Sequence, residues 1–225
     1  MLTALDSRAA LLLLTTDAIA DSGELVQRLR GDINAKKTML LEATPALVGY
    51  YSNGSSALAA DFYELQRDEA RVVSKFAAVP VVLDRSEKIR RGVLWAADPL
   101  EVGDTLTAAS RLAEVIQLET ARPFRDTITS NRRSDPDAVG WRRITVGGCK
   151  FCQMLADRGA IFRAETVRFA AHPNCHCTAQ PVFKTNDTGD EADVLQYIAS
   201  RRSRTPAQRG MLRDHLNSFF PDVRG

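Results

Sequence analysis

Apolar residues recur at three- and four-residue spacing through the first half of the chain, which is the period of a helix with one face in a protein core. The first stripe contains Leu5, Leu12 and Ile19 and predicts a helix over roughly 3–20. Similar stripes predict two helices between residues 22 and 52 and further helices at roughly 56–76, 85–97 and 104–130. We therefore expect a helical N-terminal part.

Polar residues and prolines set the expected boundaries between these helices. Ser22-Gly23 predicts a break. Thr44-Pro45 predicts a new helix, because the threonine hydroxyl can cap it and proline suits its first turn. Ser52-Asn-Gly-Ser55 predicts a turn. Val79–Leu83 is apolar and β-branched and predicts an extended segment, which Pro80 would confine to a sheet edge.

The second half changes character after a polar, turn-rich stretch at 131–137. Residues 150–158 suit a short helix, and alternating or β-branched runs predict strands at 141–146, 160–163 and 177–183. The expected parts are a helical domain at 1–133, a compact module at 138–183 and a basic, helical tail at 184–225. The predicted fold class is mainly α with a small α+β C-terminal module.

All four cysteines and two of the three histidines of the chain fall between residues 149 and 177. The run Cys149-Lys-Phe-Cys152 is followed by His172-Pro-Asn-Cys175-His-Cys177. Thiolate and imidazole suit zinc, and a two-residue spacing lets one turn present two ligands. The sequence therefore predicts a structural zinc site that holds the C-terminal module together.

Five side chains compete for the four positions of a tetrahedral zinc site. The set we expect is Cys149, Cys152, His172 and one of the pair Cys175 and Cys177. His176 lies between two cysteines and would point to the opposite face of an extended stretch. Two disulfides or four reduced thiols are the alternatives, and the disulfides require an oxidising compartment.

We expect neither a signal peptide nor a membrane-spanning segment in this sequence. The apolar run Ala9–Leu14 is short and is bracketed by Asp6 and Asp17, which argues against a signal peptide. No stretch approaches the ~20 apolar residues of a membrane span. We expect a protein of the cytoplasm, or of a particle assembled there.

The net charge of +2 is unevenly distributed. Residues 1–121 carry 13 Lys/Arg against 17 Asp/Glu, whereas residues 122–225 carry 17 against 11. A basic half is compatible with a nucleic-acid neighbour, and equally with a solvated basic surface. The candidate DNA-contacting residues are Arg132, Arg133, Arg142, Arg143, Arg201, Arg202 and Arg204.

Two blocks around the metal-ligand candidates carry a family resemblance. Gly148–Gly159 and His172–Phe183 resemble the C-terminal block of phage minor head proteins related to the Mu F protein, in the branch found in tailed phages of actinobacteria. The stretches Ala138–Arg143 and Ala60–Tyr63 are similar to that branch as well. The resemblance implies a minor capsid or head-morphogenesis protein inside the phage head. Its implied partners are the portal protein, the major capsid protein and packaged double-stranded DNA.

Two other functions are weighed against this one. A zinc deaminase needs His-x-Glu before Pro-Cys-x-x-Cys, and no glutamate here follows a histidine by two residues. We find no Ser-His-Asp arrangement either, so we expect no enzymatic activity. A zinc-containing DNA-binding regulator is the alternative, but residues 150–158 offer only Lys150, Asp157 and Arg158 as charged side chains for reading DNA.

Overall fold

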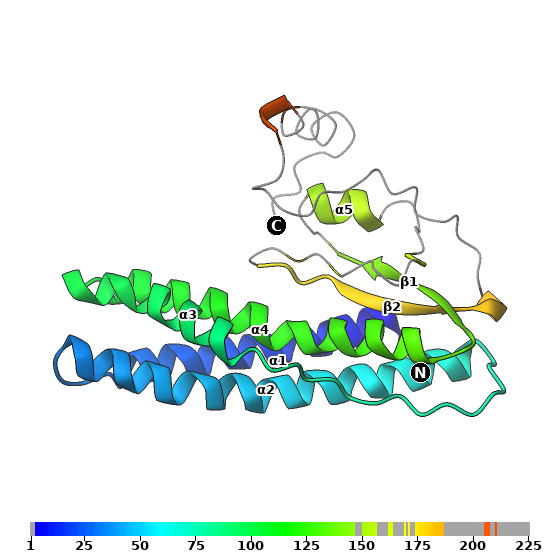
Figure 1. Cartoon of the computed structure of the whole chain (residues 1–225), viewed down its shortest axis with the longest axis horizontal. Coiled ribbons are helices and arrows are strands. Elements are labelled where there is room, and N and C mark those ends of the chain that lie inside the picture. Colours follow the sequence, from blue (N-terminus) through cyan, green and yellow to red (C-terminus); the bar gives the residue numbers. More distant parts are fainter. Residues whose placement is uncertain are drawn as a thin grey trace.

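The computed structural model describes residues 3–146, 150–156, 162–163, 169, 171, 174–186, 205–207 and 210. Within this part, five α-helices precede or flank a small two-stranded sheet (Figure 1). The helices are α1 Ala4–Gln27, α2 Ile33–Glu69, α3 Ser86–Ala97, α4 Thr105–Ser134 and α5 Lys150–Ala156. The strands are β1 Ala138–Ile144 and β2 Thr178–Phe183, with 3₁₀ helices at Asp98–Val102 and Lys184–Asn186. The predicted fold class, mainly α with a small α+β C-terminal module, is confirmed.

Helix α4 lies at the centre of the molecule. It packs along α1, α2 and α3, and both strands of the sheet also contact it. In Figure 1 the sheet lies along one half of the bundle, on the side of α4, while α3 lies along the other half. The core accordingly forms two clusters in the bundle, one around Ile116 and one around Phe124 of the same helix.

Helix α1 passes through the predicted break at Ser22-Gly23 and ends only at Gln27. The Ser22 hydroxyl is buried and donates to the Ile19 carbonyl at 2.7 Å, so this polar side chain is satisfied inside the helix. The predicted inward stripe was also wrong, since Leu5 is 56% exposed. The stripe that is buried is Ser7, Leu11, Thr15, Ala18, Ser22 and Val26.

Helix α2 is one helix of 37 residues where the sequence predicted a boundary and a turn. Thr44-Pro45 and the Ser52–Ser55 stretch both lie within it. Ser52 and Ser55 are buried, and a Cβ added to Gly54 would lie 3.1 Å from Cδ1 of Leu14 in α1. Small residues that resemble a turn signal therefore permit a close approach of two helices.

Residues 72–85 form a connection along α4 that is neither helix nor strand, so the sheet edge predicted for residues 79–83 was wrong. It pairs with side chains of the helix instead of a strand. The Asn131 amide group accepts from the Val79 N–H and donates to the Val79 carbonyl, both at 2.8 Å. The Thr127 hydroxyl bonds the N–H and the carbonyl of Val81 at 2.9 and 3.3 Å. The predicted helix at 56–76 accordingly ends early, at Glu69.

The sheet pairs β1 with β2 in antiparallel fashion, with Trp141 opposite Pro181. Both strands agree with the sequence prediction within a few residues. Of the strand predicted at 160–163, only Phe162 and Arg163 are described, and Phe162 forms an isolated bridge with Trp141. The Phe162 ring stacks on that of Trp141 at 4.4 Å. The three-part domain division stays a prediction, as does the helical tail, most of which lies outside the described residues.

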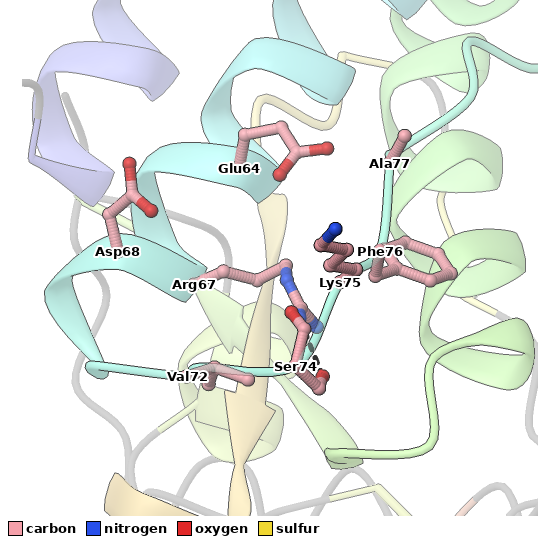
Figure 2. A pocket seen from close by; sticks show the side chains of 8 residues that line it. All are labelled: Glu64, Arg67, Asp68, Val72, Ser74, Lys75, Phe76 and Ala77. Carbon is pink, nitrogen blue, oxygen red and sulfur yellow. Dashed lines mark hydrogen bonds between the residues drawn. The ribbon is translucent and has the colours of Figure 1, made fainter.

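A buried ion pair ties the end of α2 to the start of the sheet. The Arg67 guanidinium donates to the Asp135 carboxylate, and both side chains are at most 4% exposed. The Tyr63 hydroxyl donates to the same carboxylate at 3.1 Å. Arg67 also donates to the Ser74 carbonyl at 2.7 Å, beneath an open hollow of about 420 Å³ (Figure 2). The pair thus joins α2, the connection and the residues that lead into β1.

Replacing Asp135 with alanine should lower the free energy of unfolding by about 3 kcal/mol, because it leaves the buried Arg67 cation without its anion. Urea unfolding followed by circular dichroism measures the change. The matched control is Glu101→Ala, which removes the solvent-exposed pair with Lys37 and should leave the unfolding midpoint nearly unchanged. Equal effects of the two substitutions would contradict the importance of the buried pair.

Candidate metal centre

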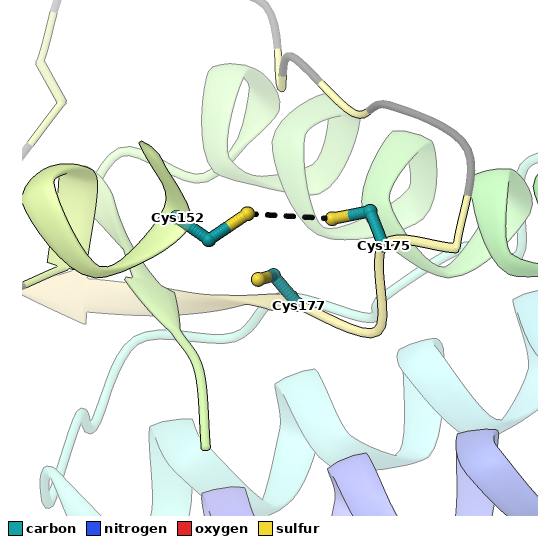
Figure 3. Close-up of side chains that lie close together, drawn as sticks. All are labelled: Cys152, Cys175 and Cys177. Carbon is teal, nitrogen blue, oxygen red and sulfur yellow. Dashed lines mark hydrogen bonds between the residues drawn. The ribbon is translucent and has the colours of Figure 1, made fainter. Parts of the chain in front are cut away.

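Three cysteine side chains meet where α5 approaches the start of β2 (Figure 3). Cys152 comes from α5, and Cys175 and Cys177 come from the segment that leads into β2. Their sulfur atoms all lie within 4.8 Å of one another, and the Cys152 and Cys175 sulfurs are 3.8 Å apart. Each side chain is at most 2% exposed.

This spacing fits a shared metal ion. Two sulfurs bound to one tetrahedral zinc at about 2.3 Å each would be about 3.8 Å apart. A disulfide would bring them to about 2.05 Å, and the three cysteines are free thiols. The hydrogen bond from Cys152 lowers the pKa of Cys175 and raises that of Cys152, so the cluster favours a thiolate at Cys175. Three buried sulfurs in this arrangement could bind a metal.

The local backbone explains why two of the thiols come from one short segment. Asn174 adopts a left-handed conformation, with φ of 60°, which turns the chain immediately before Cys175. Alternate residues of an extended segment share a face, so Cys175 and Cys177 point the same way and His176, between them, is only half-buried. The expectation that one of these two cysteines would complete the site differs from the structure, which places both in the cluster.

Helix α4 holds this segment through two buried polar side chains. The Gln117 side-chain amide donates to the Cys175 carbonyl at 3.1 Å and accepts from the Asn174 N–H at 3.1 Å. The Arg125 guanidinium donates to the Cys175 carbonyl at 2.6 Å and to the Cys177 carbonyl at 2.9 Å. The sequence analysis missed both residues. The sequence did contain a signal for them. A glutamine and an arginine, eight positions apart, lie beside apolar core residues of the same helix.

Arg143 reaches the cluster from β1. Its guanidinium lies 3.9 Å from the Cys152 sulfur and 4.0 Å from the Cys175 sulfur. The Phe169 ring contacts the guanidinium groups of both Arg143 and Arg125, at 3.8 and 5.0 Å. Burial lowers the pKa of Arg125, an effect that the neighbouring Cys175 sulfur opposes. Two cations therefore lie beside the sulfurs, where they favour the thiolate form.

The predicted DNA-contacting arginines differ in how exposed their side chains are. Arg143 is 3% exposed, so the prediction that it contacts DNA was wrong, since its guanidinium is directed toward the thiols. Arg132 is half-buried and donates to the Val139 carbonyl at 3.1 Å. Arg142 is also half-buried, whereas Arg133 is exposed at the end of α4. The candidates that lie outside the described residues are Arg201, Arg202 and Arg204 and, for the metal, Cys149 and His172.

Comparison with known protein families gives one match, to the family described as VG15 protein, over residues 3–200. The chain belongs to the VG15 protein family. This is a family of phage (viral gene) proteins, so the chain is a phage-encoded protein. The VG15 match spans the helical bundle and the cysteine cluster together. No curated protein and no solved structure matches the chain. No helix in the described part has the length and apolar character to cross a membrane.

Proposed function

We propose that this VG15 protein is a minor capsid or head-morphogenesis protein. It acts inside the phage head near the portal and aids head assembly, genome packaging or DNA ejection. The observation that carries the proposal is the VG15 match over residues 3–200, which assigns the chain to a phage. The resemblance of its Cys/His block to Mu F-related minor head proteins narrows the role to the head.

The metal in this proposal is a structural zinc ion. The sulfurs of Cys152, Cys175 and Cys177 would bind it, with Cys149 or His172 as the fourth ligand. Zinc would tie α5 to the start of β2 and so hold together a module whose described part contains two paired strands. With Cys149 or His172 as the fourth ligand, all four coordination positions would be filled, which is typical of a structural site, since a catalytic zinc keeps one position open. We therefore propose no enzymatic activity.

The helical bundle would contact the portal protein and the major capsid protein, and the basic half would face packaged DNA. Arg132, Arg133 and Arg142 are the described arginines that can contribute to the DNA-facing surface, because each is at least partly exposed. Contacts of this type go to phosphates and do not depend on base sequence. The alternative of a sequence-reading regulator has little support, since the described residues of α5 include one charged side chain, Lys150, and its Cys152 is buried.

The location in the virion can be tested directly. Mass spectrometry of purified phage particles should detect the protein in few copies, and added protease should not digest it until the heads are opened. Affinity purification from infected cells should recover the portal protein with it. The reference is a tail protein, which protease reaches in intact particles. A protein found only in the unassembled fraction would rule out the proposed role.

Elemental analysis of the purified chain should find about one zinc per molecule, as one closed tetrahedral site requires. Cys152→Ser should lose the metal, because it removes one of three clustered sulfurs. His176→Ala is the matched control, since this residue lies between two ligands and should leave the zinc content unchanged. Zinc retained by Cys152→Ser at the level of the unmodified chain would show that the cluster is not the site.

Binding to random-sequence duplex DNA should weaken steeply as salt increases. Arg133→Gln should reduce the slope of log K against log salt by about one, because one phosphate contact is lost. Arg28→Gln is the control, another exposed arginine, in the acidic half of the chain. A DNA affinity that does not change with salt, or a slope that falls equally in both variants, would contradict the proposed DNA contact.

A further inference from the structure

Arg125 makes its hydrogen bonds to the backbone of the candidate metal centre. It is 3% exposed, and its Nε and Nη2 atoms donate to the carbonyls of Cys177 and Cys175. Its guanidinium face lies 5.0 Å from the centre of the Phe169 ring. In the described part of the chain it forms no salt bridge with a carboxylate. A buried cation with these contacts needs an explanation beyond packing.

The geometry of the guanidinium explains how it could fix two ligands at once. Its donors form a rigid planar fork, and two of them bind carbonyls two residues apart. Fixing both carbonyls fixes the backbone on either side of His176 and therefore the direction of the Cys175 and Cys177 side chains. Gln117 fixes the preceding peptide from the same helix. The ligand segment is thus shaped by α4.

The charge of Arg125 suits a metal bound by thiolates. Three thiolates on one divalent ion leave a net negative charge, and this centre is buried. A neighbouring cation stabilises such a centre, and Arg125 also holds the backbone that carries two of its three cysteines. Metal binding should therefore strengthen the contact between Arg125 and the ligand segment.

We propose that Arg125 is a positioning residue of the metal centre, which orients Cys175 and Cys177 and couples metal binding to the docking of the sheet on α4. The inference rests on the proposed zinc site. It adds that part of the affinity for the metal originates in the helical bundle, outside the cluster of ligands.

The test uses the full chain loaded with Co²⁺, whose thiolate charge-transfer bands report on the geometry of the site. Arg125→Lys keeps the charge but cannot form the fork, and it should shift these bands. Zinc affinity, measured by competition with a chelator, should fall about 10- to 100-fold, the usual effect of losing a residue that supports metal ligands. Arg125→Gln, which also removes the charge, should lower the zinc affinity further. Arg122→Gln, three positions earlier on α4, should retain the affinity and the spectrum of the unmodified chain.

The outcomes separate the two proposals. An unmodified chain that binds neither Co²⁺ nor zinc would overturn both the zinc site and the role of Arg125. Binding by the unmodified chain, together with an unchanged affinity and spectrum in Arg125→Lys, would overturn the role of Arg125 alone. A destabilisation that is equal in the metal-free and metal-loaded forms of Arg125→Lys would also overturn it, because a purely structural arginine predicts that result.

Discussion

When a helix is covered on nearly every side, its polar side chains cannot form hydrogen bonds with water. The second half of α4 is in this position, with α1, α2, the extended connection and the sheet around it. Each buried polar residue there must find a partner, in its own helix or in another segment, because an unsatisfied buried group is costly. Asn131 and Thr127 bond the connection, Glu119 binds Arg85, and Arg125 bonds the cysteine segment. The polar residues of one helix thereby specify where two other segments lie, the connection and the cysteine segment.

The sequence predicted the helices at 85–97 and 104–130 well, because each has a clear apolar stripe and a strong boundary. It failed where α1 and α2 pack together. There serine, threonine and glycine lie among the apolar residues of the interface, and local rules assign these polar and small residues to breaks and turns. Gly54 shows the reason, since its role is to let Leu14 of another helix approach. A contact between residues 40 positions apart leaves no trace in the local pattern.

The candidate metal centre was predictable to the extent that its ligands are close in sequence. Cysteine spacing located the site, and the alternation of an extended chain accounts for Cys175 and Cys177 sharing a face. The arginines could not be assigned from sequence. Arg143 was grouped with the surface charges because it lies in a basic run, and only the fold shows that it is directed toward the thiols. Side chains that reach the site from α4 require knowledge of which helix face the sheet covers.

The length of α2 has a consequence for how the molecule meets its surroundings. At about 1.5 Å per residue its 37 residues span about 55 Å. The sheet lies along one half of this length (Figure 1). Val102 ends the 3₁₀ helix that follows α3, and Leu106 lies in the first turn of α4; they are 85% and 84% exposed. The junction of α3 and α4 lies at the end of the bundle away from the sheet. The helices therefore keep the apolar side chains that are exposed at the tip of the bundle well separated from the sheet.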